Sequence, residues 1–239
     1  MPKTLCRLLA LALLCCSCRS TLAQAEIAID VGHGVDDGGA VSARGRDEFL
    51  FNQELAALLA EQVRHLGHIV RPINFSGTQS TLQERPLLAV GSDFFISIHH
   101  DSVGEAYLQP WEWEGIERTH TEVKRGFGLF VSANNPDLRT SLRCASSMGA
   151  LLRRAGFTPS DWHSRKHFAA DADNGVWFYD NLFVLQRTTL PAVLFEAGVI
   201  KHKEEELELR DPARQRRMAE TLASGLAACL QVRETPAPE

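Results

Sequence analysis

The sequence predicts an α/β fold: a three-layer α/β/α sandwich around a mostly parallel, mixed central sheet. Patterns typical of strands and of helices alternate along the 239 residues. The strands are apolar on both faces, as strands are when helices cover both sides of a sheet. The composition, 44% hydrophobic and 23% charged, is that of an ordinary globular chain and argues against disorder and coiled coil. A chain of this length suffices for one domain with a sizeable core.

The first half of the chain supplies three predicted strands and two predicted helices. Residues 26–31 (EIAIDV) are apolar and end in a Gly-His-Gly turn, which predicts a buried strand leading into a glycine-rich loop. Apolar residues recur at helical spacing over residues 48–66, and Gly67 follows as the terminator. The other predicted elements are strands over residues 68–73 and 93–99 and a helix over residues 81–90.

The second half begins with a charged excursion over residues 104–125, which contains Trp111 and Trp113. Residues 158–180 are expected to be irregular, because they are rich in Asp, His and aromatic residues. A final helix over residues 211–232 has Pro212 near its first turn, where proline is favoured. The remaining predictions are strands over residues 127–132, 184–186 and 192–196 and a helix over residues 138–155.

The first 25 residues have the features of a secretory signal peptide. Lys3 and Arg7 precede nine apolar residues, a run too short to span a bilayer, and residues 23–25 form an A-x-A cleavage site. We therefore expect export across the inner membrane into the periplasm, one folded domain over residues 26–232 and a flexible tail over residues 233–239. A lipoprotein anchor is a less favoured alternative, because the residues before the cysteines of this segment match a lipobox poorly.

Removal of this segment changes the charge and the cysteine content. The segment carries three basic residues and no acidic one, so the net charge goes from −5 to −8, which argues against a nucleic-acid partner. The cysteines that remain are Cys144 and Cys229. Their spacing leaves open whether they pair; we expect two buried thiols, with one disulfide as the alternative. No later apolar run is long enough for a transmembrane segment, and we expect a monomer.

Metal-capable side chains follow three of the predicted strands. His33, His99 and Glu196 stand at strand ends, and Glu48 begins a helix. Sheets of this class place their sites at the carboxyl ends of strands. Two histidines with one carboxylate are a standard set of catalytic zinc ligands, and a further glutamate supplies the general base that a zinc hydrolase needs. The absence of an H-E-x-x-H motif excludes a zincin.

At these residues the sequence resembles the zinc-dependent N-acetylmuramoyl-L-alanine amidases of the Amidase_3 family, which cleave bacterial peptidoglycan. The matching segments occur in family order: residues 27–34 (IAIDVGHG) followed by Glu48, residues 94–99 (FFISIH) and residues 184–198 (VLQRTTLPAVLFEAG). The resemblance implies an amidase catalytic domain that cuts the bond between N-acetylmuramic acid and L-alanine. It also implies that Zn²⁺ is bound by His33, Glu48 and His99 and that the catalytic residue is Glu196. His100 stands where the family usually has alanine.

Four further features are open on the sequence alone. Asp30 is a candidate to orient a zinc-bound imidazole. Arg187 either holds an anionic group of the stem peptide or pairs with a nearby acid. Residues 104–125 either form a cap or groove wall near the active site or are a solvated surface excursion. Residues 158–180, in which His163 lies among aromatic residues, either line a substrate groove or form a surface loop with no role in binding.

Two other functions share these features. A zinc carboxypeptidase-like peptidase has the same kind of sandwich and a His-Glu-His set. A degenerate, non-catalytic peptidoglycan-binding domain has the same fold without catalytic activity, but the presence of all three ligands and of Glu196 argues against it. An activator protein is a further candidate partner, which the sequence does not identify.

Overall fold

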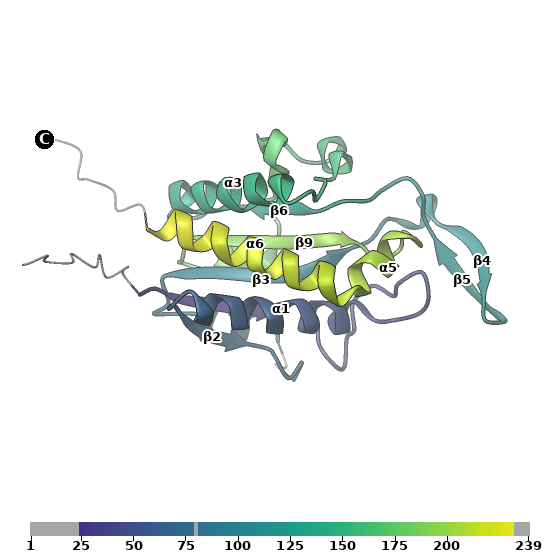
Figure 1. Cartoon of the computed structure of the whole chain (residues 1–239), viewed down its shortest axis with the longest axis horizontal. Helices are drawn as coiled ribbons and strands as arrows, with labels where there is room; N and C mark the ends of the chain where they lie inside the picture. Colours follow the sequence, from purple (N-terminus) through teal and green to yellow (C-terminus); the bar gives the residue numbers. More distant parts are fainter. Residues whose placement is uncertain (1–23, 79–80, 232–239) are drawn as a thin grey trace, which may run out of the picture.

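A computed structural model describes residues 24–78 and 81–231 (Figure 1). At its centre lies a seven-stranded sheet. Its strands are β1 (Glu26–Val31), β2 (Ile69–Ile73), β3 (Phe94–Asp101), β6 (Gly128–Val131), β7 (Ala169–Asp171), β8 (Val176–Phe178) and β9 (Ala192–Val199). The order across the sheet is β2-β1-β3-β9-β6-β8-β7. Only the β9–β6 and β8–β7 pairs are antiparallel, so the sheet is mixed and mostly parallel, as predicted.

Helices cover both faces of the sheet unequally. The long helices α1 (Glu48–His65), α3 (Leu138–Arg154) and α6 (Pro212–Leu230) lie together over one face, and α5 (Glu205–Arg210) leads into α6 (Figure 1). Their buried side chains form the larger hydrophobic core with one set of alternating strand residues. The short helices α2 (Glu84–Leu88) and α4 (Phe183–Arg187) belong to the opposite face, where a smaller core forms. The three-layer prediction is therefore confirmed.

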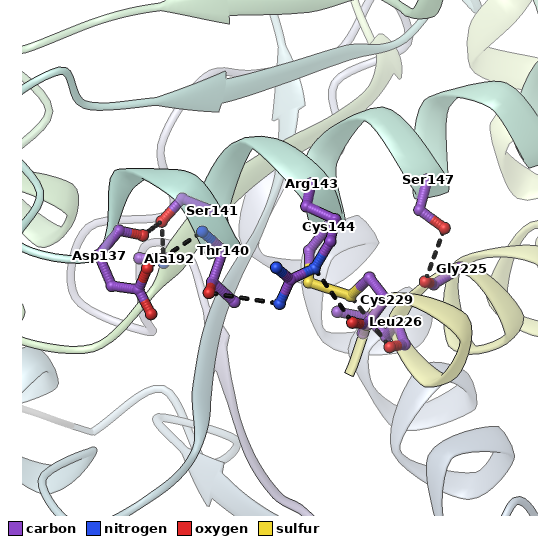
Figure 2. The surroundings of a disulfide bond; sticks show 10 residues. All are labelled: Asp137, Thr140, Ser141, Arg143, Cys144, Ser147, Ala192, Gly225, Leu226 and Cys229. Carbon is purple, nitrogen blue, oxygen red and sulfur yellow. Dashed lines mark hydrogen bonds between the residues drawn. A yellow bond between two sulfur atoms is a disulfide. The ribbon is translucent and has the colours of Figure 1, made fainter. Parts of the chain in front are cut away.

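Helices α3 and α6 pack closely because small residues lie between them. A Cβ atom on Gly225 would lie 2.7 Å from the Cα atom of Met148, so any larger residue there would push the helices apart. The Ser147 hydroxyl donates to the Gly225 carbonyl at 3.0 Å, across the same contact (Figure 2). The close approach also brings one cysteine from each helix together.

The expectation of two buried thiols is wrong. Cys144 of α3 and Cys229 of α6 form a disulfide, with their Cα atoms 5.1 Å apart (Figure 2). Both residues are buried. The sequence could not decide this, because pairing depends on the distance between two helices separated by 85 residues of chain.

Short elements account for the other corrections. The predicted strand over residues 184–186 lies in helix α4, because a short apolar run has no periodicity that separates a strand from a helix. Residues 158–180, expected to be irregular, contribute β7 and β8 to the central sheet. The helix predicted over residues 81–90 is reduced to α2. The excursion over residues 104–125 folds as an antiparallel hairpin of β4 (Gln109–Trp113) and β5 (Ile116–His120).

The chain ends are only partly described. Residues 1–23 of the predicted signal peptide and the predicted tail lie outside the described residues. Ala25, the last residue of that predicted peptide, is buried; its amide donates to Nδ1 of His68 and its carbonyl accepts from Ile69. Within residues 24–78 and 81–231, no helix combines the length and hydrophobicity that crossing a membrane requires.

The disulfide is expected to stabilise the fold without supporting the site. It lies in the helix layer, near the end of α6 that is remote from the β4–β5 hairpin (Figure 1). Replacing both cysteines by alanine should lower the free energy of unfolding by about 2–4 kcal/mol, because the unfolded chain loses a constraint. Urea unfolding with and without reductant measures this. A wild-type midpoint that reductant does not move, although both thiols become titratable, would contradict the prediction.

Candidate metal centre and active site

Three parallel strands end beside one another and carry three of the predicted site residues. β1 pairs with β3, and β3 with β9, so the residues at their carboxyl ends share one edge of the sheet. His33 follows β1, while His99 lies directly opposite Glu196 in the β3–β9 ladder. Helix α1 begins at the same edge and brings Glu48 to it. The fold thus collects all four residues that the sequence singled out.

The loop after β1 holds His33 in a left-handed backbone conformation, with φ of 63°. The side chains of Asn74 and Arg85 both donate to the His33 carbonyl, the second at 2.6 Å. Gly32 is required beside it, because a Cβ atom there would lie 2.3 Å from the His99 ring. These contacts place the two imidazoles, whose ring centroids are 5.2 Å apart.

The Glu48 carboxylate bridges the two imidazoles. Its Oε2 atom lies 3.1 Å from Nε2 of His33, and its Oε1 atom lies 3.1 Å from Nδ1 of His99. Burial by itself would raise the pKa of Glu48, but the hydrogen bonds with both histidines outweigh it and hold that pKa well below its usual range. The carboxylate is therefore ionised in the folded protein.

These three residues fit a zinc ion. One ligand atom from each lies within 4.8 Å of the other two, and two imidazole nitrogens with one carboxylate oxygen are a known catalytic zinc set. The Asn52 amide donates to Oε1 of Glu48 at 3.2 Å and orients the carboxylate from outside the set. Sequence reasoning missed Asn52, although its position one helical turn after Glu48 was a usable signal.

His100, the neighbour of the second histidine, has a different role. Its Nδ1 atom lies 2.8 Å from Oδ1 of Asn52, and its backbone amide donates to Glu48 at 3.3 Å. The side chain is buried against Phe51 in the helix layer. Burial lowers the pKa of His100 to about 3, so the ring is neutral. His100 therefore supports the Glu48 carboxylate and lies on the opposite face of β3 from His99.

Glu196 has the opposite electrostatic environment to Glu48. Its Oε2 atom is buried and has no hydrogen-bond partner in the described part of the chain. Burial, together with the nearby carboxylates of Asp101 and Glu48, raises the pKa of Glu196 well above its ordinary value. A half-buried carboxyl group with a raised pKa, at the edge of a pocket, suits a general base that later acts as an acid.

An ion pair that the sequence did not predict lines the same pocket as Glu196. The Lys124 ammonium contacts the Asp101 carboxylate and donates to the Ser102 carbonyl at 3.0 Å. Nε2 of His163 lies 3.4 Å from the same carboxylate. Lys124 ends the 104–125 excursion, and no local pattern links it to a strand end 23 positions earlier in the chain.

The two residues that were open on the sequence lie apart from the metal ligands. Asp30 accepts a hydrogen bond from Ser97 at 2.6 Å and pairs with Arg85, rather than contacting an imidazole. Arg85, which pairs with Asp30, also donates to the His33 carbonyl and so links Asp30 to His33. Arg187 is exposed at the end of α4, with its guanidinium over the Phe183 ring. Of these two side chains, Phe183 lines the pocket beside the histidines and Arg187 does not.

Two pockets meet at this edge of the sheet and share Leu182. The metal-side pocket, of about 350 Å³, is lined by His33 and His99 with Asp36, Asp37, Arg85 and Phe183. The Trp162 pocket, of about 200 Å³, is lined by Glu196 with Tyr107, Trp162, His163, Lys166 and Tyr179. A larger cavity of about 630 Å³, between residues 125–127 and the start of α6, holds none of the predicted site residues. The metal-side pocket and the Trp162 pocket together hold His33, His99 and Glu196.

The excursion and the aromatic stretch both reach the Trp162 pocket. Tyr107 and Lys124, at the two ends of the excursion, line it, whereas the β4–β5 hairpin between them projects away from the sheet (Figure 1). The base of the excursion therefore lines this pocket, while the groove-wall role of residues 104–125 stays a prediction. Residues 162–179 supply much of the remaining wall, which supports the groove-lining alternative for that stretch.

The family model for N-acetylmuramoyl-L-alanine amidases matches residues 27–228, which include all four site residues. The chain belongs to the Amidase_3 family. The probable N-acetylmuramoyl-L-alanine amidase AmiB of Haemophilus influenzae is 27% identical over 231 residues, covering 86% of this chain and 52% of the relative. The chain therefore spans about half the length of the curated relative that it matches.

Solved structures of other amidases share the fold. The N-acetylmuramyl-L-alanine amidase Ami1 from Mycobacterium smegmatis superimposes with a TM-score of 0.72 at 18% identity, covering 90% of this chain and all of that one. The CwlD amidase from Clostridioides difficile, solved in complex with the GerS lipoprotein, gives 0.64 at 18% identity, covering 88% of this chain and all of its own. At these identities the likeness establishes the Amidase_3 fold alone.

Metal binding should distinguish the two adjacent histidines. We expect one zinc ion per chain, which His99→Ala removes because it deletes one of three converging ligands. His100→Ala should keep the zinc, although the cavity left beside Asn52 lowers the melting temperature. Elemental analysis of the purified variants, with thermal unfolding as the control for folding, measures both effects. Equal zinc loss in the two variants would refute the assignment.

Proposed function

We propose that this chain is a zinc-dependent N-acetylmuramoyl-L-alanine amidase with its catalytic domain over residues 26–232. It would cut the amide bond between the lactyl group of N-acetylmuramic acid and the L-alanine of the peptidoglycan stem peptide. One observation carries the proposal: His33, Glu48 and His99 converge on one point, while Glu196, whose Oε2 atom has no hydrogen-bond partner within residues 24–78 and 81–231, lies opposite His99 on the adjacent strand. Membership of the Amidase_3 family supports the choice of this bond.

The site residues would have two different roles, metal binding and proton transfer. His33, Glu48 and His99 would hold a zinc ion, which when bound supplies a water of lowered pKa and polarises the scissile carbonyl. Glu196 accepts the proton of the attacking water, which its raised pKa favours, and returns it to the leaving amine of L-alanine. Asn52 keeps the Glu48 carboxylate aimed at both histidines while this happens.

The variant Glu196→Gln separates catalysis from metal binding. Glutamine keeps the size of the side chain but cannot accept the proton, so turnover should fall about 10²–10⁴-fold. Zinc content should remain at the wild-type value, because the three ligands are intact. Turnover on purified peptidoglycan is measured beside zinc content and melting temperature. A folded, zinc-loaded variant with near-normal turnover would remove Glu196 from the mechanism.

The substrate class is tested with defined compounds. The proposal expects zinc-loaded protein to release free stem peptides from a soluble muramoyl-peptide, and a chelator to abolish this release. Plain peptides without a muramoyl group should survive. Cleavage of plain peptides alone would identify a carboxypeptidase-like peptidase, and tight binding without cleavage would identify a non-catalytic module.

Export to the periplasm is part of the same proposal, because the peptidoglycan lies there. The predicted cleavage after Ala25 gives a mature chain that starts at Glu26 and lacks the two Ala25 hydrogen bonds. Intact mass and N-terminal sequencing of protein from the periplasmic fraction should show this terminus. A chain that still starts at Met1 would contradict export, and a start at Gln24 or Ala25 would correct the cleavage position. An activator protein is a further proposed partner, which the complex of the CwlD amidase with the GerS lipoprotein supports only as a precedent for a bound partner protein.

A further inference from the structure

The mechanism above uses one residue of the Trp162 pocket, Glu196, and leaves the rest of the pocket without a role. Its wall is assembled from parts of the chain that are distant in sequence: Tyr107 near the start of the excursion, Trp162 and His163 in a short 3₁₀ turn, and Tyr179 after β8. The Trp162 and Tyr107 rings meet edge to face, with centroids 4.8 Å apart. The pocket is therefore a built feature of the tertiary structure.

His163 presents an unsatisfied polar atom in this pocket. The residue is only 5% exposed, and its Nε2 atom, 3.4 Å from Oδ2 of Asp101, forms no hydrogen bond of good geometry within the described residues. Burial, aided by the charge of Lys124, lowers the pKa of His163 to about 3, so the imidazole is neutral and acts through hydrogen bonding. The ring lies over Gly128, where a Cβ atom would come within 2.8 Å of Nε2. A buried polar atom without a partner is costly unless a ligand supplies one.

The two pockets differ in the charge at their rims. Lys166 is exposed at the Trp162 pocket and forms no ion pair with the described residues. The other lysine there, Lys124, is neutralised by Asp101. The metal-side pocket instead carries exposed Asp36 and Asp37, while its buried Arg85 pairs with Asp30 on the opposite side. These side chains therefore favour an anionic group at the Trp162 pocket, whereas at the metal-side pocket Asp36 and Asp37 oppose one except at the bound metal itself.

We propose that the Trp162 pocket is the subsite for the stem peptide on the leaving-amine side of the scissile bond. In it His163 Nε2 hydrogen-bonds the peptide backbone, and Lys166 attracts the peptide carboxylates. The muramoyl group then occupies the metal-side pocket. This assignment of substrate direction rests on the proposed amidase function.

The position of Glu196 supports the same orientation of the substrate, independently of the charges at the pocket rims. A general base that returns its proton to the leaving amine must lie beside that amine. Glu196 lines the Trp162 pocket and does not line the metal-side pocket. The peptide that carries the amine therefore extends past Glu196, toward His163 and Trp162.

Binding of the free stem tetrapeptide, a product that the enzyme cannot cut further at this bond, tests the subsite without requiring turnover. Isothermal titration calorimetry on the zinc-loaded protein compares the tetrapeptide with its fully carboxyl-amidated form. Lys166→Glu should raise Kd for the acidic peptide about three- to tenfold, as expected for an exposed charge contact, and leave the amidated peptide unchanged. Arg154→Glu, the same charge change on an exposed residue of α3, is the matched control.

His163 is tested with two substitutions. His163→Phe removes the hydrogen bond while keeping a planar ring against Phe130, and should raise Kd about tenfold or more for both peptides. His163→Gln, which can still donate or accept, should recover part of the affinity. Zinc content and melting temperature near the wild-type values show that neither variant acts by unfolding the site.

The outcomes separate this inference from the proposed function. Equal Kd values for Lys166→Glu and Arg154→Glu would overturn the subsite, as would a wild-type protein that binds neither peptide. Tighter binding of the acidic peptide by Asp36→Asn and Asp37→Asn, with no effect of Lys166→Glu, would place the peptide in the metal-side pocket instead. Turnover of a soluble muramoyl-tetrapeptide is measured in parallel. Its absence in wild type would refute the amidase function, whereas the Kd series still decides the peptide subsite.

Discussion

The parallel alignment of β1, β3 and β9 is the constraint on which the site depends. Parallel strands end at the same edge of a sheet, so residues far apart in the chain reach one place without long loops. The ladder register sets His99 directly opposite Glu196. Helix α1 closes the arrangement, because its first residue is the carboxylate that bridges both imidazoles. A shift of β3 by one residue would turn His99 to the helix layer and present His100 instead.

The surroundings of two glutamates at this edge shift their pKa values in opposite directions. Glu48 is held ionised by His33 and His99 against the effect of burial, as a metal ligand must be. Glu196 lies near other carboxylates, its buried Oε2 atom has no hydrogen-bond partner among the described residues, and its pKa rises. Such a divergence between neighbouring acids is how one site separates a binding role from a proton-transfer role.

The contacts that stabilise the helix layer and the pockets of the candidate site lie in different regions of the fold. The disulfide and the close α3–α6 contact at Gly225 lie in the helix layer, away from the pockets. Much of the wall of the Trp162 pocket comes from the excursion and from residues 162–179, which also supply the edge strands β7 and β8 of the central sheet. The ion pair between Lys124 and Asp101 fastens the end of the excursion beside the site, while the hairpin tip remains outside. Variation in the excursion can therefore alter the pocket without disturbing the metal ligands.

The sequence by itself determined the fold class and the long elements, and it singled out His33, Glu48, His99 and Glu196 as candidates, because each stands at an apolar strand end or at the start of a periodic helix. It could not determine what depends on distances between separate elements. The tertiary structure alone decided that Cys144 pairs with Cys229, that residues 184–186 are helical, and that Asp30 meets Arg85 rather than an imidazole. It also decided that Lys124 and His163 gather around Glu196. Local periodicity reports which face of an element is buried, whereas pairing and pocket walls arise only when packing brings distant segments within contact distance.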